Sequence, residues 1–158
     1  MATTTLTAQN GKAATVRKTF SRQTSVSTEI NADSSIIWAL LTDAAGYPRW
    51  NNTVIAIDGN ISAGENIKLK STLDPKRTFK LRVKKFDPEH KLVWGDAMGN
   101  RVYTLMENGN GPVLFSMTEK IGGPLFPLFA KMIPSFDNSF EQFAAGLKKE
   151  AENIMNTK

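Results

Sequence analysis

The chain has 158 residues, which is enough for one domain with a substantial hydrophobic core. It contains no cysteine and a single histidine, His90, so disulfides, thiolate sites and a zinc centre built on a histidine pair are excluded. The formal net charge is +5, but residues 1–28 hold four of the basic residues and no acidic one, which leaves the rest of the chain nearly neutral. A nearly neutral body lacks the dense basic face that nucleic-acid binding requires, and we expect no nucleic-acid partner.

The N-terminal residues 1–23 are basic and rich in threonine, alanine and serine, and we expect them to precede a folded domain of residues 24–157. Their composition leaves three alternatives open: a disordered extension, an additional packed segment, or an organelle-targeting peptide. Because they supply little apolar surface, we expect the fold to survive removal of residues 1–22. The chain has no run of about 18 apolar residues and no secretory signal, which favours a cytoplasmic protein without a membrane span.

The domain is predicted to begin with a strand followed by two short helices. Apolar and polar residues alternate from Thr24 to Asn31 with the two-residue period of a strand. The run Asp33-Ser34-Ser35 is a helix-start signal, and the apolar residues after it predict a short helix that ends near Asp43. A second helical turn is expected around Pro48. Its Trp50 either closes one end of a cavity or simply packs in the core.

The middle of the chain reads as about six antiparallel strands joined by turns. They are expected at residues 54–57, 67–71, 79–84, 92–94, 101–106 and 113–121, with Asn108-Gly109-Asn110-Gly111 as a hairpin turn before the last. Alternation points one set of side chains inward and leaves Lys68, Lys70, Lys80, Arg82 and Lys84 on the outer face of the sheet. We interpret this outer face as solvated, with weak attraction to an anionic surface as the alternative.

The last third of the chain, residues 122–156, has the pattern of one long amphipathic helix. Its apolar stripe consists of Leu125, Phe129, Met132, Phe136, Phe140, Phe143, Leu147, Ala151 and Ile154, at steps of three or four. A stripe this bulky must lie against a large concave surface, and only the predicted sheet offers one. A curved sheet around one helix often leaves a gap, which is where a binding site is expected.

Two segments resemble a known family. The run from Asn31 to Asp43, continued by Tyr47 to Asn51, is similar to the opening of polyketide cyclase/dehydrase-like proteins of the START-related superfamily, and Gly122 to Phe126 is similar to their closing segment. The resemblance covers residues 24–155. It implies an α+β helix-grip fold, in which a curved antiparallel sheet wraps around the long C-terminal helix and encloses an apolar cavity.

Strand alternation also supplies the candidate binding residues. Arg101, Tyr103 and Leu105 share one face of a strand, and Phe115, Met117 and Glu119 share one face of the next. A buried guanidinium and carboxylate must pair or bind a polar ligand group, so a structural ion pair, a ligand-orienting pair and an acid–base pair all stay open. The candidate ligand-binding residues are Trp50, Phe79, Trp94, Arg101, Tyr103, Phe115, Met117, Glu119, Phe129 and Phe136; Asp96 is a weaker one.

The balance of apolar and titratable residues favours a carrier or binding protein for a hydrophobic small molecule, such as a lipid or a polyketide-like compound. The alternative is a cyclase or dehydratase that uses acid–base residues of the cavity, and a third reading is chaperone-activator-like protein interaction. The only histidine falls in the turn Asp87-Pro88-Glu89-His90, which disfavours a Ser-His-Asp triad. We expect no cofactor and no metal. The ligand and the oligomeric state stay open.

Overall fold

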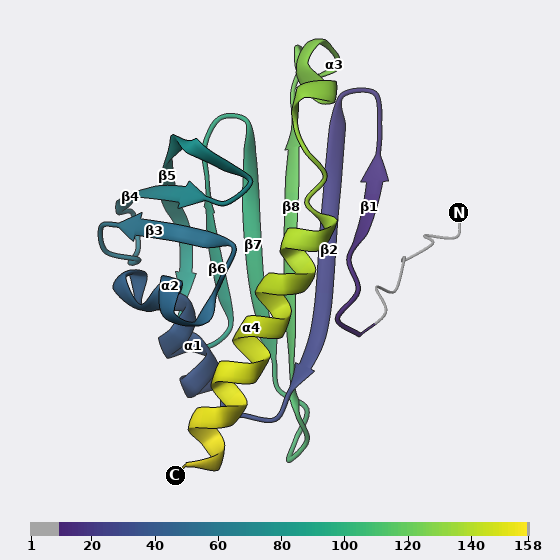
Figure 1. Ribbon diagram of the computed structural model, residues 1–158. Helices are drawn as coiled ribbons and strands as arrows, with labels where there is room; N and C mark the ends of the chain where they lie inside the picture. Colours follow the sequence, from purple (N-terminus) through teal and green to yellow (C-terminus); the bar gives the residue numbers. More distant parts are fainter. Residues whose placement is uncertain (1–9, 158) are drawn as a thin grey trace.

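The computed structural model describes residues 10–157, which form a single antiparallel sheet with helices along its concave side (Figure 1). The strands are β1 (Ala14–Arg17), β2 (Ser21–Ile30), β3 (Val54–Asp58), β4 (Asn66–Ser71), β5 (Asp74–Asp87), β6 (Lys91–Gly95), β7 (Gly99–Met106) and β8 (Val113–Gly122). The helices are α1 (Ser34–Thr42), η1 (Ala44–Gly46), α2 (Tyr47–Trp50), α3 (Phe126–Phe129), η2 (Ala130–Met132) and α4 (Asp137–Asn156). Among the described residues the eight strands have the spatial order β1-β2-β8-β7-β6-β5-β4-β3. The expected α+β helix-grip architecture is confirmed.

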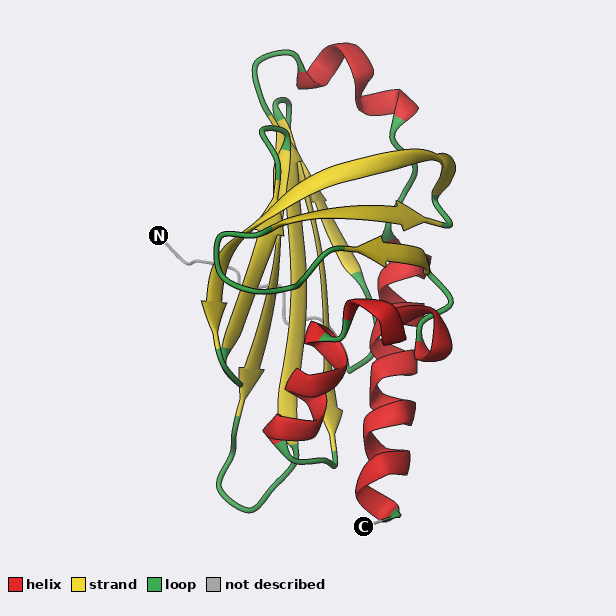
Figure 2. Ribbon diagram, turned by 90° about the vertical axis from the view of Figure 1, so that its left-hand side faces the viewer, coloured by secondary structure: helices red, strands yellow, loops and turns green. Residues whose placement is uncertain are grey.

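The sheet curls around α4, which lies along its concave side (Figure 2). One stripe of α4 is buried there, namely Phe140, Phe143, Ala144, Leu147 and Ala151. On the other flank α4 meets the short helix α2: a Cβ added to Gly146 would lie 2.6 Å from the Trp50 carbonyl oxygen. The two helices therefore approach too closely for any side chain larger than hydrogen at this position.

The single helix expected over residues 122–156 is wrong for the part before Asp137. The chain forms two short helical turns, α3 and η2, then an extended stretch, and α4 begins only at Asp137. Pro134 causes the break, because proline lacks the N–H that continues a helix and disfavours helical geometry in the residue before it. Ile133 accordingly has a ψ of 120°. Leu125 and Met132, which belonged to the expected stripe, are 63% and 82% exposed.

The structure also differs from the sequence-based boundary at Thr24. β2 already begins at Ser21. A further strand that the sequence analysis did not predict, β1, lies within the expected N-terminal extension and pairs with β2 from Ala14↔Ser25 to Arg17↔Arg22. The Ala13 N–H donates to the Glu141 side chain of α4 at 3.1 Å, and the Thr15 hydroxyl hydrogen-bonds the Asp137 carboxylate. Of the three alternatives for this region, the additional packed segment describes residues 14–23. Residues 1–9 lie outside the described part of the chain.

The strand register in the other half of the sheet follows the alternation of the sequence. Ile67, Leu69 and Val83 are buried, whereas the five basic residues of β4 and β5 expected on the outer face are exposed: Lys68, Lys70, Lys80, Arg82 and Lys84. β5 is longer than expected and starts at Asp74. His90 lies exposed in the β5–β6 turn, as the sequence indicates.

Removing residues 1–22 is expected to lower the thermal midpoint by about 5 °C or more relative to the chain that lacks only residues 1–9. The deletion removes β1 and the buried Arg22, and it leaves the carbonyl groups that Arg22 contacts without their donor. Thermal unfolding followed by circular dichroism measures the difference. Equal midpoints for the two truncated chains would contradict this account and restore the view that residues 10–22 are dispensable.

Candidate functional site

A cavity of about 230 Å³ lies between the β3–β8 part of the sheet and the C-terminal segment. Its apolar wall comes from the concave side of the strands and from residues around the break before α4. Residues that supply this wall include Leu69, Phe79, Leu81, Trp94, Ile121, Ile133, Pro134 and Phe136. The cavity is thus located where the expected continuous helix is interrupted. It is open to solvent, and the exposed residues Met98 and Met132 are part of its lining.

One ion pair gives the apolar wall a polar pole. Arg101 on β7 and Glu119 on β8 are directly opposite one another in the strand register, and both side chains line the cavity. Arg101 donates from Nε to Glu119 Oε1 at 3.2 Å and from Nη2 to Glu119 Oε2 at 3.4 Å. The side chains are only 15% and 18% exposed. This forked arrangement fixes the guanidinium in place at the edge of a largely apolar space.

Burial and charge act against each other at Arg101. Burial is the largest single influence and lowers the pKa of its guanidinium, but the Glu119 carboxylate and Tyr103 together raise it by more, so that the net shift is upward. The guanidinium also lies over the ring of Phe140, 4.9 Å from its centroid, which stabilises the cation further. Arg101 is therefore a permanent cation and a hydrogen-bond donor, and it cannot act as a base.

Tyr103 lies two residues further along β7, on the same face but deeper in the core. It is 1% exposed, and its hydroxyl meets no hydrogen-bond partner among the described residues. Burial raises the pKa of Tyr103 well above its ordinary value, against the lowering effect of the nearby Arg101 charge. The hydroxyl is consequently neutral over the physiological range and serves only as a neutral donor or acceptor.

The remaining candidate residues fall into two groups. Phe79, Trp94 and Phe136 line the cavity together with Arg101 and Glu119. The second group is buried in the core and does not line the cavity; it consists of Trp50, Tyr103, Phe115 and Met117. Phe129 lies half-buried on α3 beside Phe126, with ring centroids 6.0 Å apart, and it too is outside the cavity. A role in ligand binding stays a prediction for every one of these residues, and only the first group lines the cavity.

The buried aromatic residues among these candidates form one cluster next to the cavity. Phe143 of α4 is its centre, with ring centroids 5.6 Å from Trp50, 5.6 Å from Tyr103 and 6.3 Å from Phe115. Trp94 belongs to both groups, because it contacts the Tyr103 ring at 5.0 Å and also lines the cavity. Trp50 therefore packs against α4 and does not line the cavity, which agrees with the packing alternative.

Asp96 lines the cavity, but its carboxylate is engaged by the backbone. Its Oδ1 accepts from the N–H groups of Met98 at 2.8 Å and Gly99 at 3.2 Å, which stabilises the β6–β7 turn. Among residues 10–157 no three His, Asp or Glu side chains are grouped in a way that could hold a metal ion.

Arg22 is the structural element of the site that sequence reasoning missed. It is 3% exposed on β2, and it donates to the carbonyl oxygens of Ile133 at 3.2 Å and Pro134 at 2.8 Å, with its guanidinium over the Phe136 ring. These contacts hold the segment that forms one wall of the cavity. The alternation of β2 could have revealed Arg22, because it lies at a two-residue step before the inward residues Thr24, Val26 and Thr28.

Comparison with known proteins gives a family and a fold. A family model described as "Polyketide cyclase / dehydrase and lipid transport" matches residues 21–152. No curated protein of similar sequence was found.

Solved structures of similar fold share little sequence with the chain. A conserved protein of unknown function from Enterococcus faecalis superposes with a TM-score of 0.63 at 17% identity, covering 90% of this chain and 78% of that one. A START superfamily protein from Mycobacterium smegmatis superposes with a TM-score of 0.60 at 15% identity, covering 84% of this chain and 98% of that one. DynU16, a putative protein in the dynemicin biosynthetic locus, superposes with a TM-score of 0.62 at 13% identity, covering 86% of this chain and 49% of that one. At these identities the likeness concerns the fold alone.

The two partners of the ion pair should differ in how much the loss of their charge lowers the free energy of unfolding. Glu119→Gln keeps a hydrogen-bond acceptor for Arg101 and is expected to lower the free energy of unfolding by less than ~1 kcal/mol. Arg101→Met leaves the carboxylate of Glu119 without its cation in a mostly buried position, and we expect a loss of about 2 kcal/mol. Urea denaturation of the two variants measures both values.

The matched control is Glu150→Gln, which breaks the exposed pair with Arg49 and should change stability by less than about 0.5 kcal/mol. If Arg101→Met were as harmless as this control, the description of Arg101 and Glu119 as a desolvated pair would be wrong.

Proposed function

The chain belongs to the polyketide cyclase/dehydrase and lipid transport family, and on this premise we propose that it binds a hydrophobic small molecule whose polar end is held by Arg101 and Glu119. The observation that carries the proposal is the mostly buried ion pair in the wall of a largely apolar cavity. Apolar burial contributes about 25 cal/mol per Å² of ligand surface, and one fixed polar pair orients the ligand. The cavity volume of about 230 Å³ fits a compact ligand or one end of a longer chain that continues through the opening.

The chemistry of the pole limits which head groups are favourable. Arg101 and Glu119 together carry no net charge, so a neutral hydroxyl, carbonyl or amide can replace lost water hydrogen bonds with both partners at once. An anionic head gains from the Arg101 cation but is repelled by the Glu119 carboxylate. The proposed ligand class is therefore an apolar molecule with an uncharged polar end, which includes alcohols and unionised polyketide-like carbonyl compounds.

An enzymatic role is the second candidate, favoured by the position of Glu119 in the cavity wall and by the fold shared with DynU16 of a biosynthetic locus. Acid–base catalysis works best with groups whose pKa lies near the operating pH. Here the pKa values of Arg101 and Tyr103 both move away from neutrality, and the carboxylate of Asp96 is occupied by backbone N–H groups. Glu119 alone supplies no acid and base pair, so a binding role is the better supported of the two.

Two naphthalene probes of similar size test the proposal: neutral N-phenyl-1-naphthylamine and anionic 1-anilinonaphthalene-8-sulfonate. Each should bind at about one site per chain by fluorescence titration. Ser139→Phe inserts a ring into the cavity and should weaken both probes by about tenfold or more, because Ser139 lines the cavity wall. Asn138→Phe adds the same ring at an exposed neighbouring position and should leave both affinities unchanged.

The ion-pair variants test the polar pole in the same assay. Arg101→Met should weaken the anionic probe, and Glu119→Gln should tighten it, each by about threefold or more, because one removes attraction and the other removes repulsion. The neutral probe should respond less to either substitution. Absence of probe binding, or equal effects of Ser139→Phe and Asn138→Phe, would refute the cavity as the binding site.

A further inference from the structure

Three segments meet at the end of the sheet where the cavity opens. They are the β1–β2 turn (residues 17–20), the β6–β7 turn (residues 96–98) and the connection from β8 to α4 (residues 123–136). Backbone hydrogen bonds join them: the Gly123 N–H donates to the Phe20 carbonyl at 3.0 Å, and the Gly122 N–H donates to the Met98 carbonyl at 3.0 Å. Figure 1 shows α3 at this end beside the β1–β2 turn. We call these three segments the tip.

The tip exposes large apolar side chains. Five of the eight large hydrophobic residues that are exposed in residues 10–157 belong to it: Phe20 (58%), Met98 (41%), Leu125 (63%), Leu128 (79%) and Met132 (82%). The short helix α3 already buries Phe126 against the body, yet Leu128 projects from its other side. A helical turn that is apolar on both sides is typical of a segment with a second apolar contact. A cluster of exposed apolar side chains on a soluble fold marks an interaction surface.

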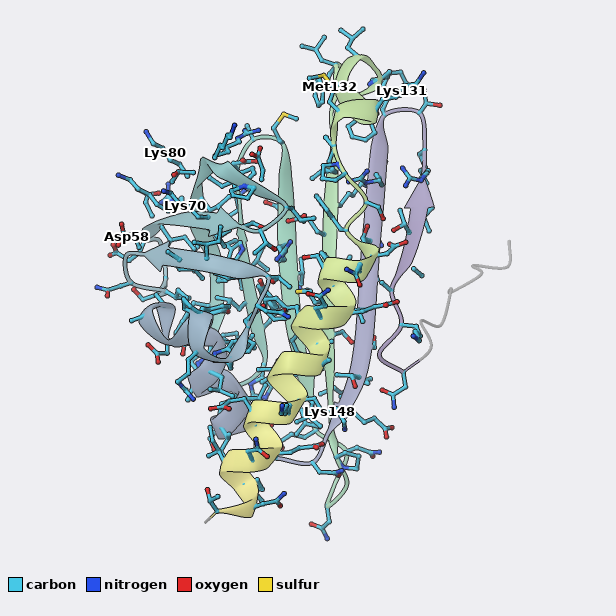
Figure 3. The ribbon with its side chains drawn as sticks, in the orientation of Figure 1. Asp58, Lys70, Lys80, Lys131, Met132 and Lys148 are labelled. Carbon is cyan, nitrogen blue, oxygen red and sulfur yellow. The ribbon has the colours of Figure 1, made fainter. Side chains whose placement is uncertain are left out.

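The charges of the tip indicate the partner. Lys131 lies between the exposed Leu128 and Met132, and the β1–β2 turn supplies Arg17 and Lys18, all three being exposed. Figure 3 shows Lys131 and Met132 together at the end of the molecule. Residues 17–20, 96–98 and 123–136 contain one acidic residue, Asp96, whose carboxylate is held by its own turn. Apolar side chains flanked by cations are the combination that binds anionic bilayer surfaces, because the apolar groups enter the interface while the cations meet the head groups.

We propose that the tip docks on an anionic lipid bilayer and that this contact sets the cavity opening against the membrane. Met98 and Met132 belong to the exposed tip and line the cavity as well, so a docked tip would place the opening at the lipid surface. The contact is peripheral: no helix in the described part of the chain is long and apolar enough to span a membrane. The proposal goes beyond binding of a ligand in the cavity and does not depend on it, since docking involves the outside of the tip.

Flotation with vesicles tests the docking without any ligand. The full chain should float with vesicles of phosphatidylcholine and phosphatidylglycerol in equal parts, and it should bind vesicles of phosphatidylcholine alone at least about tenfold more weakly. Raising the salt concentration should weaken binding to the mixed vesicles, because the screening length falls as ionic strength rises.

Matched variants locate the contact. The double variant Leu125→Ser, Leu128→Ser changes two exposed residues that do not line the cavity, and it should reduce binding to the mixed vesicles by about tenfold or more. Met106→Ser is the apolar control, since Met106 is 64% exposed at the far end of β7 and should have no effect. The charge contribution is tested with Lys131→Gln, which should weaken binding. Lys149→Gln removes the same charge on the exposed face of α4 and should leave binding unchanged.

Two further readouts keep the outcomes separate. Thermal midpoints of all variants should match the parent chain, and binding of N-phenyl-1-naphthylamine should persist in the double variant. Flotation that fails for the parent chain, or that falls equally with tip and control variants, overturns the proposal. It is also overturned if light scattering shows a dimer that the double variant dissociates while vesicles do not bind, because the tip would then be an interface between two copies.

Discussion

The packing of α4 against the concave face of the sheet is the contact on which the rest of the structure depends. Phe143 is its centre: the ring lies among those of Tyr47, Trp50, Tyr103 and Phe115. One side chain thus joins α4, α2 and the neighbouring strands β7 and β8. Gly146 lets α2 approach on the next turn of the helix. This half of the concave face is filled. The other half loses its helix at Pro134, and the unfilled space there is the cavity.

The boundary between the filled and the open half carries the buried charges. Arg101 lies over the ring of Phe140 near the start of α4, and Arg22 lies over the ring of Phe136 just before it. Arg22 is held by two backbone carbonyl groups and Arg101 by a carboxylate, so neither cation is left without compensation. Arg22 therefore holds one wall of the cavity in place, and Arg101 supplies a polar group of its lining. Stability and the proposed binding function share this pair of guanidinium groups.

The sequence was sufficient for the fold and for the faces of the strands, because the two-residue period holds along most of β4, β5, β7 and β8, with irregularities only near Ser71 and Lys85. It was not sufficient for the site. Arg101, Tyr103, Phe115, Met117 and Glu119 lie on the same side of neighbouring strands, yet only Arg101 and Glu119 line the cavity. The difference is how far along the strand α4 reaches, and periodicity carries no information about that. Pro134 was a readable signal for the break, whereas the inward position of Trp50 depends on the approach of α4 at Gly146 and is a purely tertiary effect.

The account's central claim is that a ligand occupies the open half of the concave face and that the aromatic cluster stays closed. Intermolecular nuclear Overhauser effects between a bound neutral apolar compound and the side chains of the isotope-labelled protein test this claim most directly. The account predicts contacts to the rings of Phe79 and Phe136 and to the methyl groups of Ile133, and none to Phe115 or Leu147. Contacts to Phe115 and Leu147 in place of these, or contacts confined to the outer face of the sheet, would contradict it.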